Sequence, residues 1–173
     1  IEYQSYCDLS LHAEAIRELT GRPVEFVPDV CGPYAVERIK AMESGDIVLL
    51  DNVRFMAEEM TLFETKLNLT PEQQAQTLVV RRLAPLADLY VCDAFAAAHR
   101  AQPTLVGFEQ VLPSAMGRLF EKEYTIISDI LKGPARPCVF VLGGAKVSDA
   151  FLMLGTMLAG GAADHVLAGG LVG

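Results

Sequence analysis

An apolar run at residues 89–92 is followed closely by three polar side chains, Asp93, His99 and Arg100. A short run with Tyr and Val is typical of a strand buried on both faces of a sheet. Ligands of open α/β sheets gather beyond the carboxyl ends of strands, where an Arg guanidinium can hold a phosphate or carboxylate. The sequence therefore predicts an anion site near Arg100. The alternative is that Asp93 and Arg100 only pair with each other and fix a loop.

A second arginine stands in an equivalent position. Residues 47–50 form another apolar strand pattern, and Asp51, Asn52 and Arg54 follow it directly. Two predicted strand ends that each carry an Arg favour a site for an anionic ligand over a single ion pair that fixes a loop.

A glycine turn is the third candidate. Gly143, Gly144, Ala145 and Lys146 follow a predicted strand at 138–142 and precede a predicted helix. Such a turn exposes backbone N–H groups, the amino end of a helix attracts anions, and Lys146 adds a positive charge for a phosphoryl group. The alternative is a tight connection that needs glycine only for its backbone angles. The turn is neither a Walker A loop nor a G-x-G-x-x-G turn, so P-loop kinases and dehydrogenases are disfavoured.

Helices and strands alternate in the part of the chain that must position these groups. Residues 10–20 predict a helix that ends at Gly21, with an inward face formed by Leu11, Ala15, Ile16 and Leu19. A short strand at 24–27 follows. Pro33 then opens a second helix that ends at Gly45, with an inward face formed by Val36, Ile39 and Met42. This alternation predicts an α/β fold with parallel-sheet, Rossmann-like layers.

The next segment is harder to interpret. Residues 56–69 have mixed polarity, little periodicity and three acidic residues, Glu58, Glu59 and Glu64, so we expect a surface excursion there. The sequence at 70–73 has the form of a capping box with Pro at the first helical position. It predicts one helix that continues to about Pro85.

A long helix is predicted to begin at Ser114. Apolar residues recur at spacings of three and four from Met116 to Leu131, and Gly133 and Pro134 end the pattern. Ile126 lies off this stripe, which indicates a helix contacted on more than one side. A strand, a glycine turn, a helix and a further strand that ends near Gly170 are predicted to follow.

Composition narrows the class of protein. The chain has 173 residues, of which 51% are hydrophobic and 21% charged, which excludes a disordered chain. A net charge of -8 argues against nucleic-acid binding. The four cysteines form no Cys-x-x-Cys pair and the three histidines have no ligand spacing, so we expect reduced thiols, a cytoplasmic location and no metal site in the protein. No charge-free apolar stretch reaches the ~20 residues of a membrane span, so no membrane partner is expected.

The three candidate motifs resemble phosphoglycerate kinase in their type and order, particularly the archaeal form. They are Asp51-Asn-Val-Arg54-Phe, the Asp93-Ala-Phe and Ala98-His-Arg100 segments, and Val139-Phe-Val-Leu-Gly-Gly-Ala-Lys-Val-Ser-Asp149. The resemblance covers almost the whole chain. It implies reversible transfer of a phosphoryl group in glycolysis, between 1,3-bisphosphoglycerate with Mg-ADP and 3-phosphoglycerate with Mg-ATP.

The resemblance also implies roles for individual residues. Arg54 and Arg100 would hold the phosphate of 3-phosphoglycerate, and Lys146 would be the catalytic residue that helps carry the phosphoryl group. Asp93 and His99 fit the family motif with structural roles. The nucleotide would lie beside Gly143, Gly144, Ala145, Lys146, Gly169 and Gly170. Its phosphates would supply most of the ligands of the Mg²⁺ ion.

Three segments follow from the resemblance. Residues 1–113 would form most of a substrate domain, residues 114–132 the helix between domains, and residues 133–173 the start of a nucleotide-binding domain. The family's Asp-Leu-Asn substrate motif and its Gly-Gly-Gly-Asp-Thr nucleotide loop have no match here. We therefore expect an incomplete chain that is inactive by itself and that self-associates through exposed sheet edges. The alternatives are a noncatalytic fragment or interaction module, and another phosphate-binding α/β enzyme.

Overall fold

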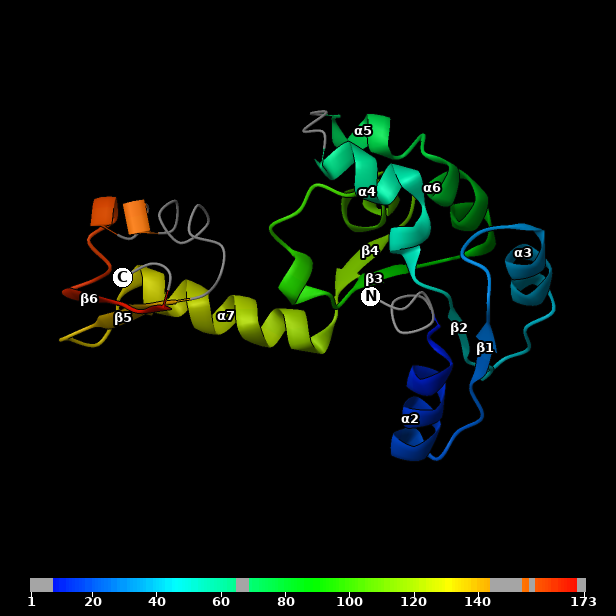
Figure 1. Ribbon diagram of the computed structural model, residues 1–173, viewed down its shortest axis with the longest axis horizontal. Coiled ribbons are helices and arrows are strands. Elements are labelled where there is room, and N and C mark those ends of the chain that lie inside the picture. Colours follow the sequence, from blue (N-terminus) through cyan, green and yellow to red (C-terminus); the bar gives the residue numbers. More distant parts are fainter. Residues whose placement is uncertain (1–7, 65–68, 144–153, 156–157, 171–173) are drawn as a thin grey trace. The chain divides into compact units, whose positions relative to one another are not determined.

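The computed structural model describes residues 8–64, 69–143, 154–155 and 158–170 (Figure 1). The chain divides into two compact units, Ile1–Gly117 and Arg118–Gly173. All strand pairs in the described residues are parallel, and helices lie between the strands in the sequence. The predicted α/β class with parallel strands is therefore confirmed.

The first unit contains two pairs of parallel strands. Phe26 lies opposite Leu49 in the β1–β2 pair, and Val91 lies opposite Ala115 in the β3–β4 pair. The elements of this unit, in chain order, are α2 (Ser10–Thr20), β1 (Glu25–Val27), α3 (Pro33–Lys40), β2 (Val48–Leu50), η1 (Val53–Phe55), α4 (Ala57–Glu64), α5 (Pro71–Gln74), α6 (Leu78–Leu83), η2 (Ala84–Leu86), β3 (Tyr90–Cys92), η3 (Phe95–Ala97), η4 (Pro103–Gly107), η5 (Phe108–Gln110) and β4 (Ser114–Met116).

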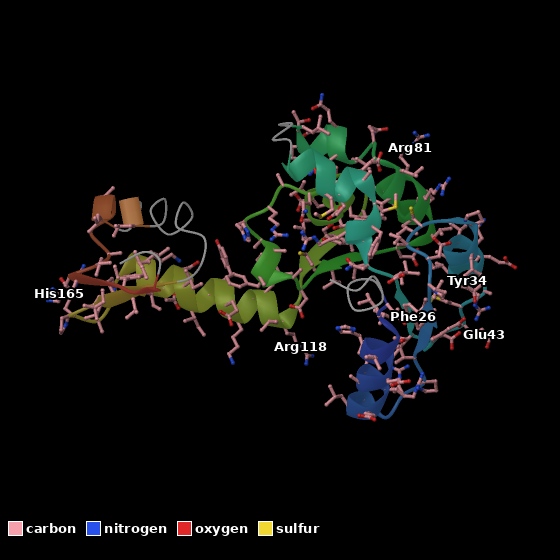
Figure 2. All side chains as sticks on the ribbon, in the orientation of Figure 1. Phe26, Tyr34, Glu43, Arg81, Arg118 and His165 are labelled. Atoms are coloured by element: carbon pink, nitrogen blue, oxygen red, sulfur yellow. The ribbon has the colours of Figure 1, made fainter. Side chains whose placement is uncertain are left out.

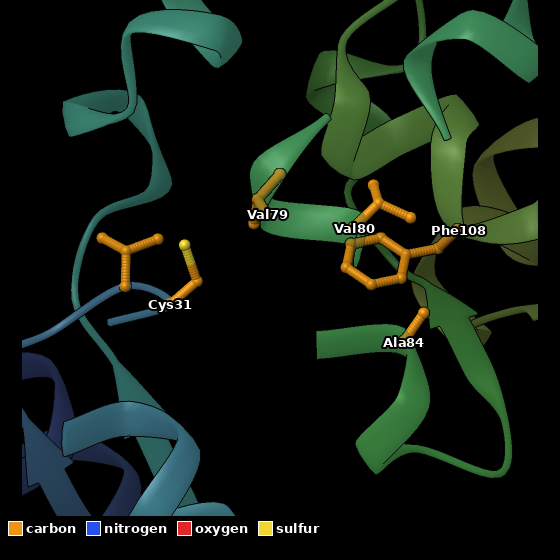
Figure 3. Close-up of a cluster of buried hydrophobic side chains, with 6 residues drawn as sticks. Cys31, Val79, Val80, Ala84 and Phe108 are labelled. Atoms are coloured by element: carbon orange, nitrogen blue, oxygen red, sulfur yellow. The ribbon is translucent and has the colours of Figure 1, made fainter. Parts of the chain in front are cut away.

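The described core of the first unit joins segments that are far apart in the sequence (Figure 3). Its side chains come from the loop after β1, from α6, from the start of η2 and from the start of η5, and they are Val30, Cys31, Val79, Val80, Ala84 and Phe108. The ring of Tyr90 on β3 stacks on Phe108, with 5.3 Å between ring centroids. This cluster fixes α6 against the segment that follows Arg100.

The first helix is confirmed but its inward face is not. Gly21 ends α2 with a left-handed φ of 66°, as the glycine predicts. The buried residue is Ala13, however, whereas Leu11 is 72% exposed and Leu19 87% exposed. The small side chain of Ala13 lets the helix backbone approach its neighbours, and the helical period alone does not say which stripe packs.

The second helix begins at Pro33 as predicted, with Ala35 as its buried residue. It ends at Lys40 instead of Gly45, so Met42 lies outside it and is 38% exposed instead of facing inward. The carboxylate of Asp29 accepts hydrogen bonds from the backbone N–H groups of Gly32, at 2.8 Å, and Ala35, at 2.9 Å. Asp29, which lies outside the helix, thus satisfies backbone N–H groups at the start of the helix.

The predicted surface excursion at 56–69 is wrong in its described part, because residues 57–64 form α4. Glu59 on this helix is only 2% exposed. The neighbouring Glu58 accepts a hydrogen bond of 2.6 Å from the backbone N–H of Leu78. Both acids have partners distant in sequence, which the local polarity pattern could not indicate.

The capping box at residues 70–73 is confirmed, but the single helix that it opens is not. The backbone N–H of Thr70 donates to Gln73 at 2.9 Å and that of Gln73 donates to Thr70 at 3.3 Å. The helix ends at Gln74, and Thr77 takes an extended conformation with its hydroxyl 2.7 Å from the carbonyl oxygen of Gln74. A separate helix, α6, then starts at Leu78.

Residues 114–116 form strand β4 and not the start of a helix. Pairing with β3 satisfies their backbone, and the bond from the N–H of Tyr90 to the carbonyl oxygen of Pro113, at 2.9 Å, extends that pairing. Val91 on β3 is 51% exposed, so this strand is not buried on both faces as predicted. The described part of its sheet consists of only two strands.

The second unit contains α7 (Arg118–Lys132), β5 (Val139–Leu142) and β6 (His165–Ala168). Strands β5 and β6 pair in parallel, and Val139 lies opposite His165 (Figure 2). No residue of α7 is buried, and Ile126, which lies off the main apolar stripe, is 49% exposed. Contacts on more than one side of this helix stay a prediction. The only described sheet of this unit has two strands and offers the helix little surface.

Candidate functional site

The turn that carries Arg54 is held by short-range contacts. It follows β2, and the side-chain oxygen of Asn52 accepts a hydrogen bond of 3.0 Å from the backbone N–H of Arg54. Asp51 in turn accepts one of 2.8 Å from the N–H of Asn52. The Arg54 side chain is exposed, with its Nε 3.0 Å from Sδ of Met60. The turn thus presents a guanidinium at the carboxyl end of a parallel strand, as the sequence predicts.

Arg100 lies beyond the carboxyl end of β3 and is half-buried. Its Nε donates to Nε2 of His99 at 3.4 Å, and its backbone N–H donates to the carbonyl oxygen of Ala97 at 3.0 Å. Arg100 directly precedes a loop, residues 101–107, that contains the helical turn η4.

A side chain of α5 and the backbone of α4 hold the start of this loop. Nε2 of Gln74 donates to the carbonyl oxygen of Ala101 at 2.9 Å. Nε2 of Gln102 donates to the carbonyl oxygen of Glu59, also at 2.9 Å. Gln74 and Gln102 are 2% and 4% exposed, so these bonds are shielded from water.

The next residues of the loop are bound by the carboxylate of Glu59. Its Oε2 accepts a hydrogen bond of 3.1 Å from the backbone N–H of Thr104, and its Oε1 accepts a short one from the Thr104 hydroxyl. On the other side, the Tyr90 hydroxyl donates to the carbonyl oxygen of Thr104 at 2.7 Å. All three polar groups of Thr104 therefore have partners outside the loop.

Electrostatics connects the two arginine-bearing segments. Burial raises the pKa of the Glu59 carboxyl, while the hydrogen bonds from Thr104 and the positive charge of Arg54 act to lower it. Burial also raises the pKa of the Tyr90 hydroxyl, which keeps it a proton donor. Glu59 thus binds the loop that follows Arg100, and the positive charge of Arg54 acts on its pKa.

Asp93 packs tightly against Gly117. A β-carbon at Gly117 would lie 2.4 Å from the Asp93 side chain, so only glycine fits there. His99 is exposed beside Arg100. The structural roles expected for Asp93 and His99 stay predictions.

The glycines of the predicted nucleotide site that the structure describes, Gly143, Gly169 and Gly170, lie close together at the ends of two paired strands. Gly143 follows β5, and Gly169 and Gly170 follow its parallel neighbour β6. The N–H of Gly169 donates to the carbonyl oxygen of Leu142 at 2.9 Å, and a β-carbon on Gly143 would lie 3.8 Å from the carbonyl oxygen of Gly169. Gly170 has a left-handed φ of 66°. The other predicted residues of this site, Gly144, Ala145 and Lys146, lie outside the described residues.

Sequence reasoning missed the residues that fix the Arg100 loop, which are Glu59, Gln74, Gln102 and Thr104. Acidic residues are almost never fully buried unless they are paired, so a polar segment is ordinarily interpreted as surface. The partners of Glu59 lie 43 and 45 positions away. No local spacing signals such a contact.

Two negative findings apply to the described ranges only. Within them, no group of three or more His, Cys, Asp or Glu side chains could hold a metal ion. Within the same ranges, no helix is long and apolar enough to cross a membrane.

The phosphoglycerate kinase family model matches residues 2–173. The chain belongs to the phosphoglycerate kinase family. Among its relatives, the phosphoglycerate kinase of Methanobacterium bryantii is 46% identical over 98% of this chain, and that of Methanothermobacter thermautotrophicus is 47% identical over 96%. The chain spans about 40% of the length of these relatives.

Solved structures of the family agree with this assignment. The crystal structure of phosphoglycerate kinase from Pyrococcus horikoshii matches with a TM-score of 0.85 at 41% identity, covering 95% of this chain and 39% of that one. The phosphoglycerate kinase from Coxiella burnetii matches with a TM-score of 0.64 at 29% identity, covering 94% of this chain and 36% of that one. The predicted family is therefore confirmed.

Proposed function

We propose that this chain is part of an enzyme that transfers a phosphoryl group reversibly between 1,3-bisphosphoglycerate with Mg-ADP and 3-phosphoglycerate with Mg-ATP. The observation that carries the proposal is membership of the phosphoglycerate kinase family over residues 2–173. The proposal includes ATP binding and a cytoplasmic location.

In this proposal, Arg54 and Arg100 bind the phosphate of 3-phosphoglycerate. Their positions at the carboxyl ends of parallel strands support it, because ligands of open α/β sheets bind there. A guanidinium forms two parallel hydrogen bonds to a phosphate and stays charged at neutral pH. The substrate phosphate would thus be oriented before transfer, which is the main contribution a protein makes to this chemistry.

The nucleotide would bind at the glycine turns of the second unit. Gly143, Gly144, Ala145, Gly169 and Gly170 would border it, and bare backbone N–H groups suit phosphate oxygens. Lys146 would be the catalytic residue and neutralise charge on the phosphoryl group in transfer, while Mg²⁺ arrives with the nucleotide. The predicted domain ranges 1–113, 114–132 and 133–173 shift with strand β4: residues 1–117 would form most of the substrate domain, α7 (Arg118–Lys132) the helix between domains, and residues 133–173 the start of the nucleotide domain. Self-association through exposed sheet edges stays a prediction.

The test is a chimera in which this chain replaces the matching segment of the Pyrococcus horikoshii enzyme. We expect the chimera to phosphorylate 3-phosphoglycerate in a coupled assay, and the 173-residue chain alone to show no turnover. Arg54→Ala and Arg100→Ala should each raise KM for 3-phosphoglycerate by about 10- to 150-fold, because a hydrogen bond to a charged group contributes ~1.5–3 kcal/mol. KM for ATP should stay nearly constant.

Lys146→Ala should instead lower kcat, by about 100- to 1,000-fold, as for other groups that neutralise charge in a transition state. Arg81→Ala is the matched control, because Arg81 is an exposed arginine on α6 (Figure 2). It should change neither constant. An active chimera in which both Arg54→Ala and Arg100→Ala keep their KM for 3-phosphoglycerate would contradict the assignment.

A further inference from the structure

Glu59 is an unusual residue to find in the interior of the first unit, because it is 2% exposed and carries a titratable group. Burying a carboxylate costs free energy unless hydrogen bonds compensate for the lost water. Here the compensation comes from one residue, Thr104, which donates both its N–H and its hydroxyl. A buried acid that is hydrogen-bonded in this way fixes the segment that contains Thr104.

Thr104 belongs to the loop that begins directly after Arg100. The backbone carbonyl of Glu59 also binds this loop, through the Gln102 side chain at 2.9 Å. The N–H groups of Leu105 and Val106 bond to the carbonyl oxygen of Gln102, at 2.9 and 3.0 Å, so the bound loop is itself a compact turn. Glu59 therefore fixes this turn at two points.

We infer that Glu59 is a positioning residue for Arg100: its buried carboxylate fixes residues 101–107 and thereby the place where the guanidinium of Arg100 is presented. Glu59 reaches Arg100 through Thr104 and the loop backbone. The functional consequence of this inference, that the substrate phosphate binds an arginine already held in place, rests on the proposed function. For this role, the hydrogen bonds of the Glu59 side chain to Thr104 matter, and its negative charge does not.

This distinction selects the variants. Glu59→Gln keeps the length and an oxygen that accepts from the Thr104 N–H, and its amide group can donate to the Thr104 hydroxyl, which then acts as an acceptor. Glu59→Ala removes both bonds. Glu58→Ala is the matched control, because Glu58 is the adjacent acid and its carboxylate binds the N–H of Leu78 and not the loop.

Amide hydrogen exchange, measured by NMR on the 173-residue chain, reports how well the backbone of the loop is held in place. In Glu59→Ala, exchange at Thr104, Leu105 and Val106 should accelerate about tenfold or more, the change expected for losing hydrogen bonds of ordinary strength. Glu59→Gln and Glu58→Ala should stay within about threefold of the wild type at these amides. The amide of Ala41, which bonds to Glu37 at the end of α3, reports whether the unit is folded.

Relaxation of the Arg100 Nε–H group gives a readout that a purely stabilising residue would not change. Arg100 should become more mobile in Glu59→Ala and recover in Glu59→Gln, while Arg81 stays the same in all variants. Loop amides and an Arg100 side chain unchanged in a folded Glu59→Ala would overturn the inference. If Glu59→Ala loses protection at Ala41, Thr104→Val decides: it keeps the backbone N–H but not the hydroxyl, and unchanged exchange in its loop overturns the inference equally.

Titration with 3-phosphoglycerate of the chimera described under Proposed function, which restores the rest of the substrate site, separates this inference from the proposed function. A shift of the Arg100 Nε–H resonance supports both. If the loop responds to Glu59→Ala as expected but no concentration of 3-phosphoglycerate shifts that resonance, the substrate assignment fails while the holding role of Glu59 stands.

Discussion

The Arg100 loop of the first unit and the glycine turns of the second unit are stabilised by different kinds of contact. Buried side chains from α4 and α5 and a half-buried tyrosine from β3 bind the backbone of the Arg100 loop. The described glycines of the second unit are exposed, and Gly169 is held by backbone pairing next to β5 and β6. A loop that depends on side chains distant in sequence is sensitive to many substitutions, whereas a turn that depends on strand pairing tolerates small changes in its surroundings.

Replacing one glycine in each region should show the largest difference. A β-carbon at Gly107 would lie 2.9 Å from Cγ2 of Val80 and 3.0 Å from the carbonyl oxygen of Gln74, whereas at Gly143 the nearest described atom is 3.8 Å away. Gly107→Ala should lower the free energy of unfolding of the first unit by about 1–3 kcal/mol, the usual cost of overpacking. Gly143→Ala should change that of the second unit by no more than ~0.5 kcal/mol.

Urea unfolding followed by unit-specific amide exchange measures both quantities, because a two-unit chain need not unfold in one step. Equal losses of stability in the two variants would show that the regions do not differ in the way described.

The contributions of two carboxyl groups, Glu59 in the first unit and Asp164 in the second, to the pH dependence of stability should have opposite signs. The pKa of Glu59 is raised by burial from its ordinary 4.5, so its contribution is greatest below that pH and is lost as pH rises through the raised value. The pKa of Asp164 is lowered from its ordinary 3.8, first by the bond from the N–H of Cys138 and then by that from Arg136. Its contribution is present above 3.8 and is lost as pH falls through the lowered value.

Glu59→Gln and Asp164→Asn test these signs. As pH rises, the stability of the wild type relative to Glu59→Gln should fall, and its stability relative to Asp164→Asn should rise. Urea unfolding of each unit from about pH 3 to about pH 8 gives both curves. Curves with the same sign would mean that one of the two carboxyl environments is described incorrectly.

The sequence predicted the features whose partners are near neighbours. The end of α2 at Gly21, the start of α3 at Pro33 and the capping box at Thr70 each involve residues within one turn of helix, so their patterns are legible locally. The placement of Arg54 and Arg100 beyond strand ends also followed, because an apolar run and its polar continuation are adjacent in the sequence.

The features that the sequence could not predict depend on distant partners. Thr77 breaks a helix that periodicity would continue, because Glu58 binds the next N–H from another helix. Residues 114–116 form a strand because β3 pairs with them. Glu59 was expected at the surface, and only the folded chain brings Thr104 to it. Tertiary contacts override local propensity in all three cases.

Calorimetric titration of 3-phosphoglycerate into the chimera, with Arg100 intact or replaced, tests the central claim most directly. Arg100→Ala should raise Kd about 10- to 150-fold, and Arg100→Lys should recover only part of the loss, because lysine keeps the charge but not the planar fork. Affinity for ATP should be the same in all three proteins. A folded Arg100→Ala chimera that binds 3-phosphoglycerate as tightly as the parent would contradict the claim that Arg100 holds the substrate phosphate.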